Sequence, residues 1–370
     1  MTEEKPRIAL ACPSFSGGGA ERVMITLANK FSEWGYPVDF IVGADQGPYK
    51  KMLASSVNKI VLTTPKLGKA RKIIRASRVL AHYLRSSGCQ TMMSTIKELN
   101  VFAVLVKIVT KSNVRLIVRE ADTLDRIFMD RGLRNKLLYK SMQFTYPWSD
   151  GVIANCKITK NDLVSRKITD ESSITVIYNP LSIKSGSNSL GLWREADKKI
   201  VACGRLHKKK NFSDLIRCVP SLKERYPNVS LKILGEGAEK EHLQKLICDL
   251  GLKDNVELVG FVDNPEDYYQ SADVFVQTSL WEGFGYVLAE AMACGTPVVA
   301  YDSKGAMREI LDNGKYGTLT PVGDLDALAS AIFLQIEKPT PQEKLKEAVK
   351  RFDKDLIASQ YLKALGINHV

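Results

Sequence analysis

The sequence predicts an α/β fold made of two Rossmann-like, doubly wound domains that face each other across a cleft. Short runs rich in Ile and Val alternate with longer helix-like stretches along the chain, as expected of repeated βα units. A Ser- and Gly-rich stretch at 181–198 interrupts this alternation once, after which it restarts. The length of 370 residues suits two domains of ordinary size.

The first domain is predicted over 1–185 and the second over 186–350, with a C-terminal helix at 351–370 that crosses back to the first domain. After a strand at 7–11 and a helix at 20–34, strands of the first domain are expected at 38–42, 59–62, 91–94, 115–119, 151–154 and 175–178. Strands of the second domain are expected at 199–203, 230–234, 256–260, 274–277, 296–300 and 318–319. Ligands of such sheets bind beyond the carboxyl ends of the strands, so the cleft between the domains is the expected site.

Composition indicates a globular protein of a reducing compartment. The chain is 45% hydrophobic and 25% charged, and its seven cysteines are scattered without a C-x-x-C pair. No signal peptide is visible, and no apolar run reaches the roughly 20 residues that span a bilayer. We therefore expect a cytoplasmic protein, peripherally associated with the inner face of the cell membrane.

The net charge of +12 is concentrated in the first half of the chain. Residues 1–180 contain 28 basic and 15 acidic side chains, whereas the remainder contains 25 and 26. This asymmetry indicates an anionic partner for the first domain, which could be membrane lipid, a lipid diphosphate or nucleic acid.

The most informative motif follows the strand that ends near residue 278. The turn Glu282-Gly-Phe-Gly285 opens a helix that carries Glu290. Backbone N–H groups and the dipole of such a helix start favour a phosphate, and the glycines permit close approach. The two glutamates are too far apart to share a proton, so they suit two hydroxyl-bearing parts of one extended ligand. Taken alone, the motif also fits a capped helix with a solvated glutamate.

Two further motifs follow strands. Arg205 and Lys210 follow the strand at 199–203. The guanidinium of an arginine can donate two parallel hydrogen bonds and the ammonium of a lysine carries a compact positive charge, and both suit a diphosphate. The alternative is a basic surface loop, an interpretation that suits Lys208 and Lys209. The turn at 16–22 is glycine-rich but lacks the G-x-G-x-x-G dinucleotide fingerprint, so it predicts either approach to a ligand or a plain tight turn.

Together these stretches resemble the retaining glycosyltransferases of family 4, which have the GT-B fold. The resemblance covers nearly the whole chain, and the spacing of Glu282 and Glu290 with that of Arg205 and Lys210 is its most specific part. Matching stretches also occur at 18–22, 178–180, 235–237, 260–262 and 272–276.

The resemblance implies catalytic roles for Arg205, Lys210 and Glu282. Arg205 and Lys210 would bind the diphosphate of the donor, and Glu282 would contact the transferred sugar. Glu290 would hold the ribose hydroxyls.

The resemblance also implies backbone contacts with the donor. Phe261 and Val262 would read the base, and Gly18 and Gly19 would close over the donor from the other domain. The N–H groups of the turn would meet the phosphate or the sugar; these belong to Gly283, Phe284 and Gly285.

One departure concerns the acceptor side. Many relatives carry a histidine at the cleft end of a strand where this chain has Arg119 and Glu120. These two residues, with Glu21, are candidate contacts for the acceptor or the sugar. The alternative for Arg119 and Glu120 is a structural ion pair.

No metal or resident cofactor is expected. The D-x-D pair Asp324 and Asp326 is interpreted as a helix start, where acidic residues favour the helix dipole. The nucleotide sugar would be a co-substrate, and the cations near residue 205 would replace a metal.

Residues 66–85 contain seven basic side chains and no acidic one. A helical wheel places Ile73 and Ile74 on an apolar arc expected to pack on the first sheet, and a basic arc opposite. The residues expected to face a membrane are Lys69, Lys72, Arg75 and Arg78. A second basic cluster contains Arg126, Arg131, Arg134, Lys136 and Lys140.

The leading interpretation is a retaining, metal-independent glycosyltransferase. It would transfer a hexose or an N-acetylhexosamine from a nucleotide sugar, with a UDP sugar favoured because it is common among similar sequences. The acceptor would be a lipid-linked saccharide in surface polysaccharide biosynthesis, such as O-antigen or capsule. The alternatives are a nucleotide-sugar epimerase or phosphorylase of the same fold, and a basic protein that binds membrane or nucleic acid. Nucleic acid is disfavoured because the chain has no recognisable binding fold or stacking platform.

Overall fold

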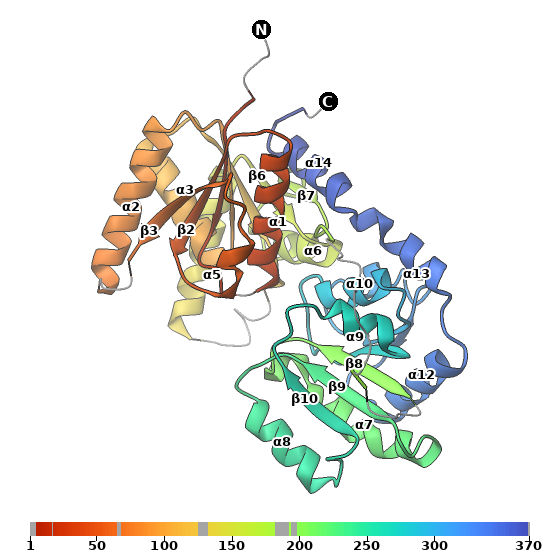
Figure 1. The fold of residues 1–370 in the computed structure, drawn as a ribbon. Helices are drawn as coiled ribbons and strands as arrows, with labels where there is room; N and C mark the ends of the chain where they lie inside the picture. The colour runs from red at the N-terminus through yellow and green to blue at the C-terminus, as the bar shows by residue number, and fades with distance from the viewer. Residues whose placement is uncertain are drawn as a thin grey trace. The chain divides into compact units, whose positions relative to one another are not determined.

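A computed structural model describes residues 5–16, 18–64, 68–124, 132–181, 192–193 and 198–368. The chain divides into two compact units, shown in Figure 1. The first contains Met1–Pro180 and Phe352–Val370, and the second contains Leu181–Arg351.

The first unit is built on a seven-stranded parallel sheet with the order β3-β2-β1-β4-β5-β6-β7. The strands are β1 Ile8–Cys12, β2 Val38–Ala44, β3 Asn58–Thr63, β4 Thr91–Thr95, β5 Arg115–Glu120, β6 Gly151–Ala154 and β7 Ile174–Val176. The strand order reverses between β1 and β4, which is the switch point of a doubly wound sheet.

Helices cover the first sheet. They are α1 Gly19–Glu33, α2 Lys69–Ser86, α3 Lys97–Thr110, α5 Leu133–Thr145, α6 Lys157–Ser165 and α14 Lys354–Ala364, with 3₁₀ turns η1 Pro48–Met52, η2 Tyr146–Trp148 and η3 Glu171–Ser173. Helix α2 packs on α3 and α3 on α5, so these three form one layer. Helix α1 packs on β1 and on the C-terminal helix α14.

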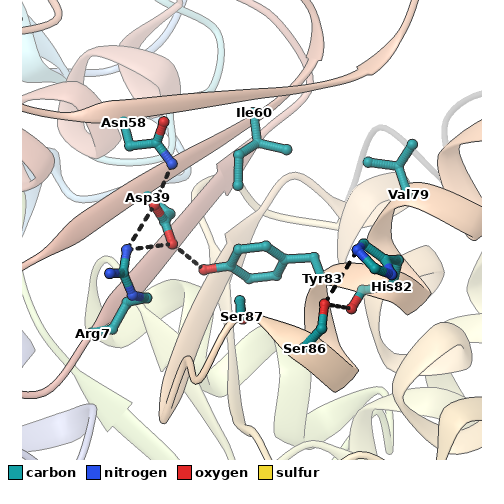
Figure 2. Close-up of a pocket in the computed structure, with 9 residues that line it drawn as sticks. All are labelled: Arg7, Asp39, Asn58, Ile60, Val79, His82, Tyr83, Ser86 and Ser87. Carbon is teal, nitrogen blue, oxygen red and sulfur yellow. Dashed lines mark hydrogen bonds and ion pairs between the residues drawn. The ribbon is translucent and has the colours of Figure 1, made fainter.

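The buried carboxylate of Asp39, near the amino end of β2, connects four parts of the first unit (Figure 2). It accepts hydrogen bonds from the Tyr83 hydroxyl at 2.7 Å, from Asn58 Nδ2 at 2.7 Å and from Arg7 Nη1 at 3.3 Å. A cavity of about 340 Å³ lies beside this group. Because the three donors come from different parts of the chain, Asp39 ties β3, α2 and the residue that precedes β1 to β2.

We expect Tyr83→Phe to lower the free energy of unfolding of the first unit by roughly 1.5 kcal/mol, because it removes a neutral donor from a buried carboxylate. Urea unfolding measures this loss. Tyr226→Phe is the control, since the Tyr226 hydroxyl donates to Glu337 at 3.4 Å in an exposed position and should cost little. Equal stability of the two variants would contradict a structural role for the Tyr83 hydroxyl.

The second unit is built on a six-stranded parallel sheet with the order β10-β9-β8-β11-β12-β13. The strands are β8 Lys199–Cys203, β9 Ser230–Leu234, β10 Val256–Gly260, β11 Val274–Gln277, β12 Val298–Tyr301 and β13 Thr318–Thr320. The order reverses between β8 and β11, so the carboxyl ends of these two strands mark the expected ligand site of this sheet.

Helices α7 and α12 pack together over one apolar core of the second unit, and α10 packs on α9 and α13. The helices are α7 Phe212–Arg225, α8 Lys240–Asp249, α9 Glu266–Ser271, α10 Tyr286–Ala293, α11 Met307–Ile310, α12 Leu325–Glu337 and α13 Gln342–Val349, with 3₁₀ turns η4 Lys208–Lys210 and η5 Lys350–Phe352. Asp324 caps α12 by accepting from the Ala327 N–H at 2.9 Å, which confirms the helix start predicted there. Among the described residues, no helix has the length and hydropathy needed to cross a bilayer.

Candidate functional site

The loops that follow β8 and β11 meet at the carboxyl edge of the second sheet. The Leu280 N–H donates to the Lys209 carbonyl at 2.9 Å. The Thr278 hydroxyl donates to the carbonyls of Lys210 at 3.1 Å and Asn211 at 3.0 Å. Two motifs about 70 residues apart therefore form one site, as the neighbouring positions of β8 and β11 require.

Glu282 is the centre of this site. Its buried carboxylate accepts hydrogen bonds at Oε1 from the Lys210 ammonium and, at 2.8 Å, from the Ser279 hydroxyl. The Lys209 ammonium lies 3.5 Å from the other oxygen, Oε2. Lys209 therefore belongs to the site, and its interpretation as part of a surface loop is wrong.

The charge state of Glu282 follows from these contacts. Burial alone would raise its pKa, but the charges of Lys210 and Lys209, with hydrogen bonds from Lys210 and Ser279, lower the pKa from 4.5 to about 2. The carboxylate is thus ionised at neutral pH. Because its pKa is lowered in the folded state, it stabilises the fold above about pH 4.5, and this contribution is lost as the pH falls toward 2.

Glycines allow the loops at this edge to pack closely. Gly204 has φ +154°, and a Cβ there would lie 2.9 Å from Cε of Lys210. A Cβ on Gly235, after β9, would overlap the Gly204 carbonyl, while the Gly235 N–H donates to the Gly260 carbonyl at 2.7 Å. The ends of β8, β9 and β10 are therefore held together through backbone. The Arg205 side chain, which follows Gly204, is exposed.

The remaining donor-site candidates lie in loops and a helix at the same edge. Gly285, with φ +81°, caps the start of α10, and Gly283 and Phe284 precede it in a buried turn. Glu290 is buried within α10. After β10, Phe261 is exposed and Val262 is partly exposed. Their contacts with ribose, phosphate and base stay predictions.

In the first unit, Gly18 and Gly19 open α1. A Cβ on Gly18 would overlap the carboxylate of Glu21, which is buried and accepts from the Ser16 hydroxyl at 2.9 Å. A Cβ on Gly19 would meet no atom within 4 Å. Packing therefore explains a glycine at position 18 but not at position 19.

Arg119 is 0% exposed, and three neutral groups surround its guanidinium. Nε donates to the Tyr361 hydroxyl at 2.8 Å, Nη2 to Asn179 Oδ1 at 2.6 Å and Nη1 to Thr95 Oγ1 at 3.3 Å. These contacts favour the structural alternative over an acceptor contact. The alternative predicted from the sequence was an ion pair between Arg119 and Glu120. In the structure the two side chains instead make hydrogen bonds to different residues.

Glu120 is also buried, and it accepts from the Tyr146 hydroxyl and from Asn100 Nδ2 at 3.1 Å. Burial raises the pKa of its carboxyl, against the lowering effects of the Lys97 charge and the two hydrogen bonds. Its environment, like that of Arg119, is that of a residue packed within the first unit.

The predicted basic helix is α2, but its apolar arc is only half covered. Leu80 and Leu84 are buried, whereas Ile73 is 62% and Ile74 is 52% exposed. The expectation that all of this arc packs on the first sheet is therefore wrong for its first turns. Arg75 and Arg78 are exposed and Lys72 is partly exposed. The side chain of Lys69, and all of Arg126 and Arg131, lie outside the described residues.

Comparisons with known proteins identify the family to which the chain belongs. Residues 17–184 match the family model described as Glycosyltransferase Family 4, and residues 191–352 match Glycosyl transferases group 1. The chain therefore belongs to the group 1 glycosyltransferases of family 4, and it has the GT-B fold.

Two curated relatives are similar over long stretches. The N-acetylgalactosamine-N,N'-diacetylbacillosaminyl-diphospho-undecaprenol 4-alpha-N-acetylgalactosaminyltransferase of Campylobacter jejuni is 29% identical over 360 residues, covering 95% of this chain and 97% of that enzyme. The phosphatidyl-myo-inositol mannosyltransferase of Mycobacterium leprae is 33% identical over 229 residues, covering 59% and 60% of the two chains.

Solved structures share the fold. Alr3699/HepE of Anabaena, in complex with UDP and glucose, superposes with a TM-score of 0.81 at 23% identity and covers 98% of this chain and 99% of that one. The lipopolysaccharide outer core galactosyltransferase WaaB superposes with a TM-score of 0.75 at 18% identity, covering 97% and 99%.

Proposed function

We propose that this glycosyltransferase transfers a hexose or an N-acetylhexosamine from a UDP sugar to a lipid-linked saccharide, with retention of the anomeric configuration and without a metal ion. The observation that carries the proposal is the group formed by Glu282, Lys209 and Lys210 beside Arg205 at the carboxyl edge of the second sheet. The ionised carboxylate of this group can accept hydrogen bonds from sugar hydroxyls. The group also has more positive than negative charges, which suits the binding of a diphosphate.

The cations take the place that a metal has in other transferases. Arg205 and Lys210 bind the departing diphosphate, and electrostatic stabilisation of that leaving group lowers the barrier. Displacement occurs on one face of the sugar, and a diphosphate oxygen helps to deprotonate the acceptor hydroxyl. Glu282 orients the sugar, and Glu290 holds the ribose. Support for a uridine diphosphate comes from the Anabaena relative, whose structure contains UDP.

The acceptor is proposed from the relatives' names and the charge of the first unit. The Campylobacter enzyme is named for a substrate linked to diphospho-undecaprenol, and the Mycobacterium enzyme for phosphatidyl-myo-inositol. An acceptor of that class presents an anionic headgroup at a membrane, which suits the basic first half of this chain. We therefore propose action at the inner face of the cell membrane in surface polysaccharide synthesis.

Nucleotide binding tests the donor site directly. We expect UDP to raise the melting temperature of the protein in the presence of EDTA, since a ligand at 100 times its Kd stabilises the folded state by about 2.7 kcal/mol. ADP and CMP should have smaller effects, and GDP tests the choice of base. No shift with any nucleotide would contradict the proposal. A rise in melting temperature that EDTA abolishes would contradict metal independence. Analysis of the reaction products would separately distinguish sugar transfer from epimerisation or phosphorolysis.

A membrane-facing surface is proposed at one end of the first unit. Helices α2 and α5 both follow strands of a parallel sheet, so both begin at its carboxyl edge, as Figure 1 shows. Their first turns expose four large apolar side chains among basic ones. The apolar residues are Ile73 (62% exposed), Ile74 (52%), Leu133 (74%) and Leu137 (57%). The neighbouring basic residues are Arg71, Lys72, Arg75, Arg134 and Lys136. Apolar side chains within a basic surface suit an anionic bilayer.

Vesicle flotation tests this surface. The wild-type protein is expected to float with phosphatidylglycerol vesicles and not with phosphatidylcholine vesicles, because each nearby cation contributes about 1 kcal/mol. The double variant Ile74→Glu/Leu137→Glu should reduce binding roughly tenfold or more. Val109→Glu is the matched control, because Val109 is 78% exposed at the opposite end of the same layer. Equal recovery with both lipids, or equal loss in the control, would contradict the assignment.

A further inference from the structure

We infer that Lys209 and Ser279 are positioning residues that hold the Glu282 carboxylate for the sugar while Lys210 binds the donor diphosphate, an inference that rests on the function proposed above. Neither residue is among the expected contacts of the donor, and Lys209 is one of three consecutive lysines. The structure distinguishes it from its neighbours.

Backbone contacts fix the position of Lys209. Its N–H donates to Nδ1 of His207 at 3.1 Å, and its carbonyl accepts from the Leu280 N–H at 2.9 Å. Its side chain is 22% exposed and directs the ammonium toward Glu282. Lys208, the preceding residue in the same 3₁₀ turn η4, has an exposed side chain. Adjacent lysines thus have different environments, and only one of this pair faces the carboxylate.

The two oxygens of Glu282 have different partners. Oε1 accepts from Lys210 and from Ser279, and Oε2 faces Lys209. When Lys210 turns to a diphosphate, Ser279 still bonds to Oε1 and Lys209 still neutralises Oε2. The carboxylate therefore keeps its orientation and its charge balance during the step in which the sugar must be held still.

Charge balance supports this division. Lys209 and Lys210 together carry two positive charges against the single negative charge of Glu282. If Lys209 compensates Glu282, then Lys210 and Arg205 are both available to the diphosphate of the donor. Without Lys209, a buried carboxylate and the diphosphate would compete for Lys210, which is unfavourable because an uncompensated buried charge is costly.

The test compares Lys209→Met and Ser279→Ala with Lys208→Met in the full chain. UDP affinity is measured by calorimetry. Turnover is measured as UDP release from whichever of UDP-glucose and UDP-N-acetylgalactosamine the wild type hydrolyses faster. We expect UDP affinity to fall only about two- to fivefold in Lys209→Met, because Glu282 then competes with the diphosphate for Lys210. It should change less than about twofold in Ser279→Ala and Lys208→Met, because UDP has no sugar for Glu282 to contact. The kcat should fall about 10- to 100-fold in Lys209→Met and less in Ser279→Ala, and it should be unchanged in Lys208→Met.

A pH profile separates positioning from a merely structural role. Loss of Lys209 or Ser279 removes a group that lowers the pKa of Glu282, so the acid limb of kcat/KM should move to higher pH. Lys209→Arg should restore most of the kcat. Equal kcat in Lys209→Met and Lys208→Met would overturn the inference. A loss of UDP affinity as large as the loss of turnover would also overturn it, because Lys209 would then bind the diphosphate. Failure of the wild-type protein to bind UDP would instead refute the proposed function.

Discussion

Replacement of Lys210 with methionine is expected to lower kcat/KM at least about 100-fold, the size of effect seen when one preorganised electrostatic contact to a transition state is removed. Lys210 donates to Glu282 in the free protein and is proposed to bind the departing diphosphate. The measurement is steady-state turnover of the preferred UDP sugar. A fully active variant would contradict the proposed role.

The same substitution should also lower the free energy of unfolding by roughly 1–3 kcal/mol, because the buried Glu282 carboxylate loses a charged partner. Its pKa should rise, so acid unfolding should begin at a higher pH. Addition of Glu282→Gln removes the buried charge and should restore part of the stability without restoring turnover. Lys208→Met is the matched control, since Lys208 is exposed and belongs to the same turn.

Arg119→Met is expected to destabilise the first unit by roughly 3 kcal/mol. The substitution leaves the acceptor oxygens of Tyr361, Asn179 and Thr95 without their donor in a buried position. Hydrogen exchange resolved by peptide measures this loss in the first unit, while UDP binding by the second unit should be preserved.

Arg115→Met provides the control for Arg119. It makes the same chemical change in the same strand, but Arg115 is exposed, and its Nη2 lies 3.5 Å from the Ala364 carbonyl. The control should lose no more than about 0.5 kcal/mol. If Arg119→Met proves as stable as the control yet fails to use the acceptor, Arg119 contacts the acceptor after all.

Strand positions were predictable from the sequence because buried parallel strands are nearly continuous apolar runs. The predicted strands at 199–203 and 256–260 coincide with β8 and β10. The strand predicted at 175–178 instead ends at Val176. Just beyond it, the Asn179 side chain accepts from Arg119, and that tertiary contact leaves no signal in the local sequence.

The donor site was only partly predictable. Motif spacing indicated Glu282 and Lys210, but it could not show which of the consecutive lysines also faces the carboxylate, because that depends on the contact between the loops after β8 and β11.

The exposure of Ile73 in α2 was missed for a related reason. A helical wheel gives the direction of a side chain and not whether a neighbour covers that turn.

The path of the chain through its two units has a consequence for folding on the ribosome. The rings of Tyr178 and Phe352 lie 5.3 Å apart, so the chain leaves the first unit and re-enters it at one place. The returning helix α14 supplies the Tyr361 hydroxyl to Arg119, and Asp355, which pairs with Lys30 at 2.8 Å. That helix is synthesised after the whole of the second unit. The second unit can therefore complete its fold during translation while the first, although begun earlier, must wait for a helix that follows the second unit, a reversal of the usual N-terminal-first order.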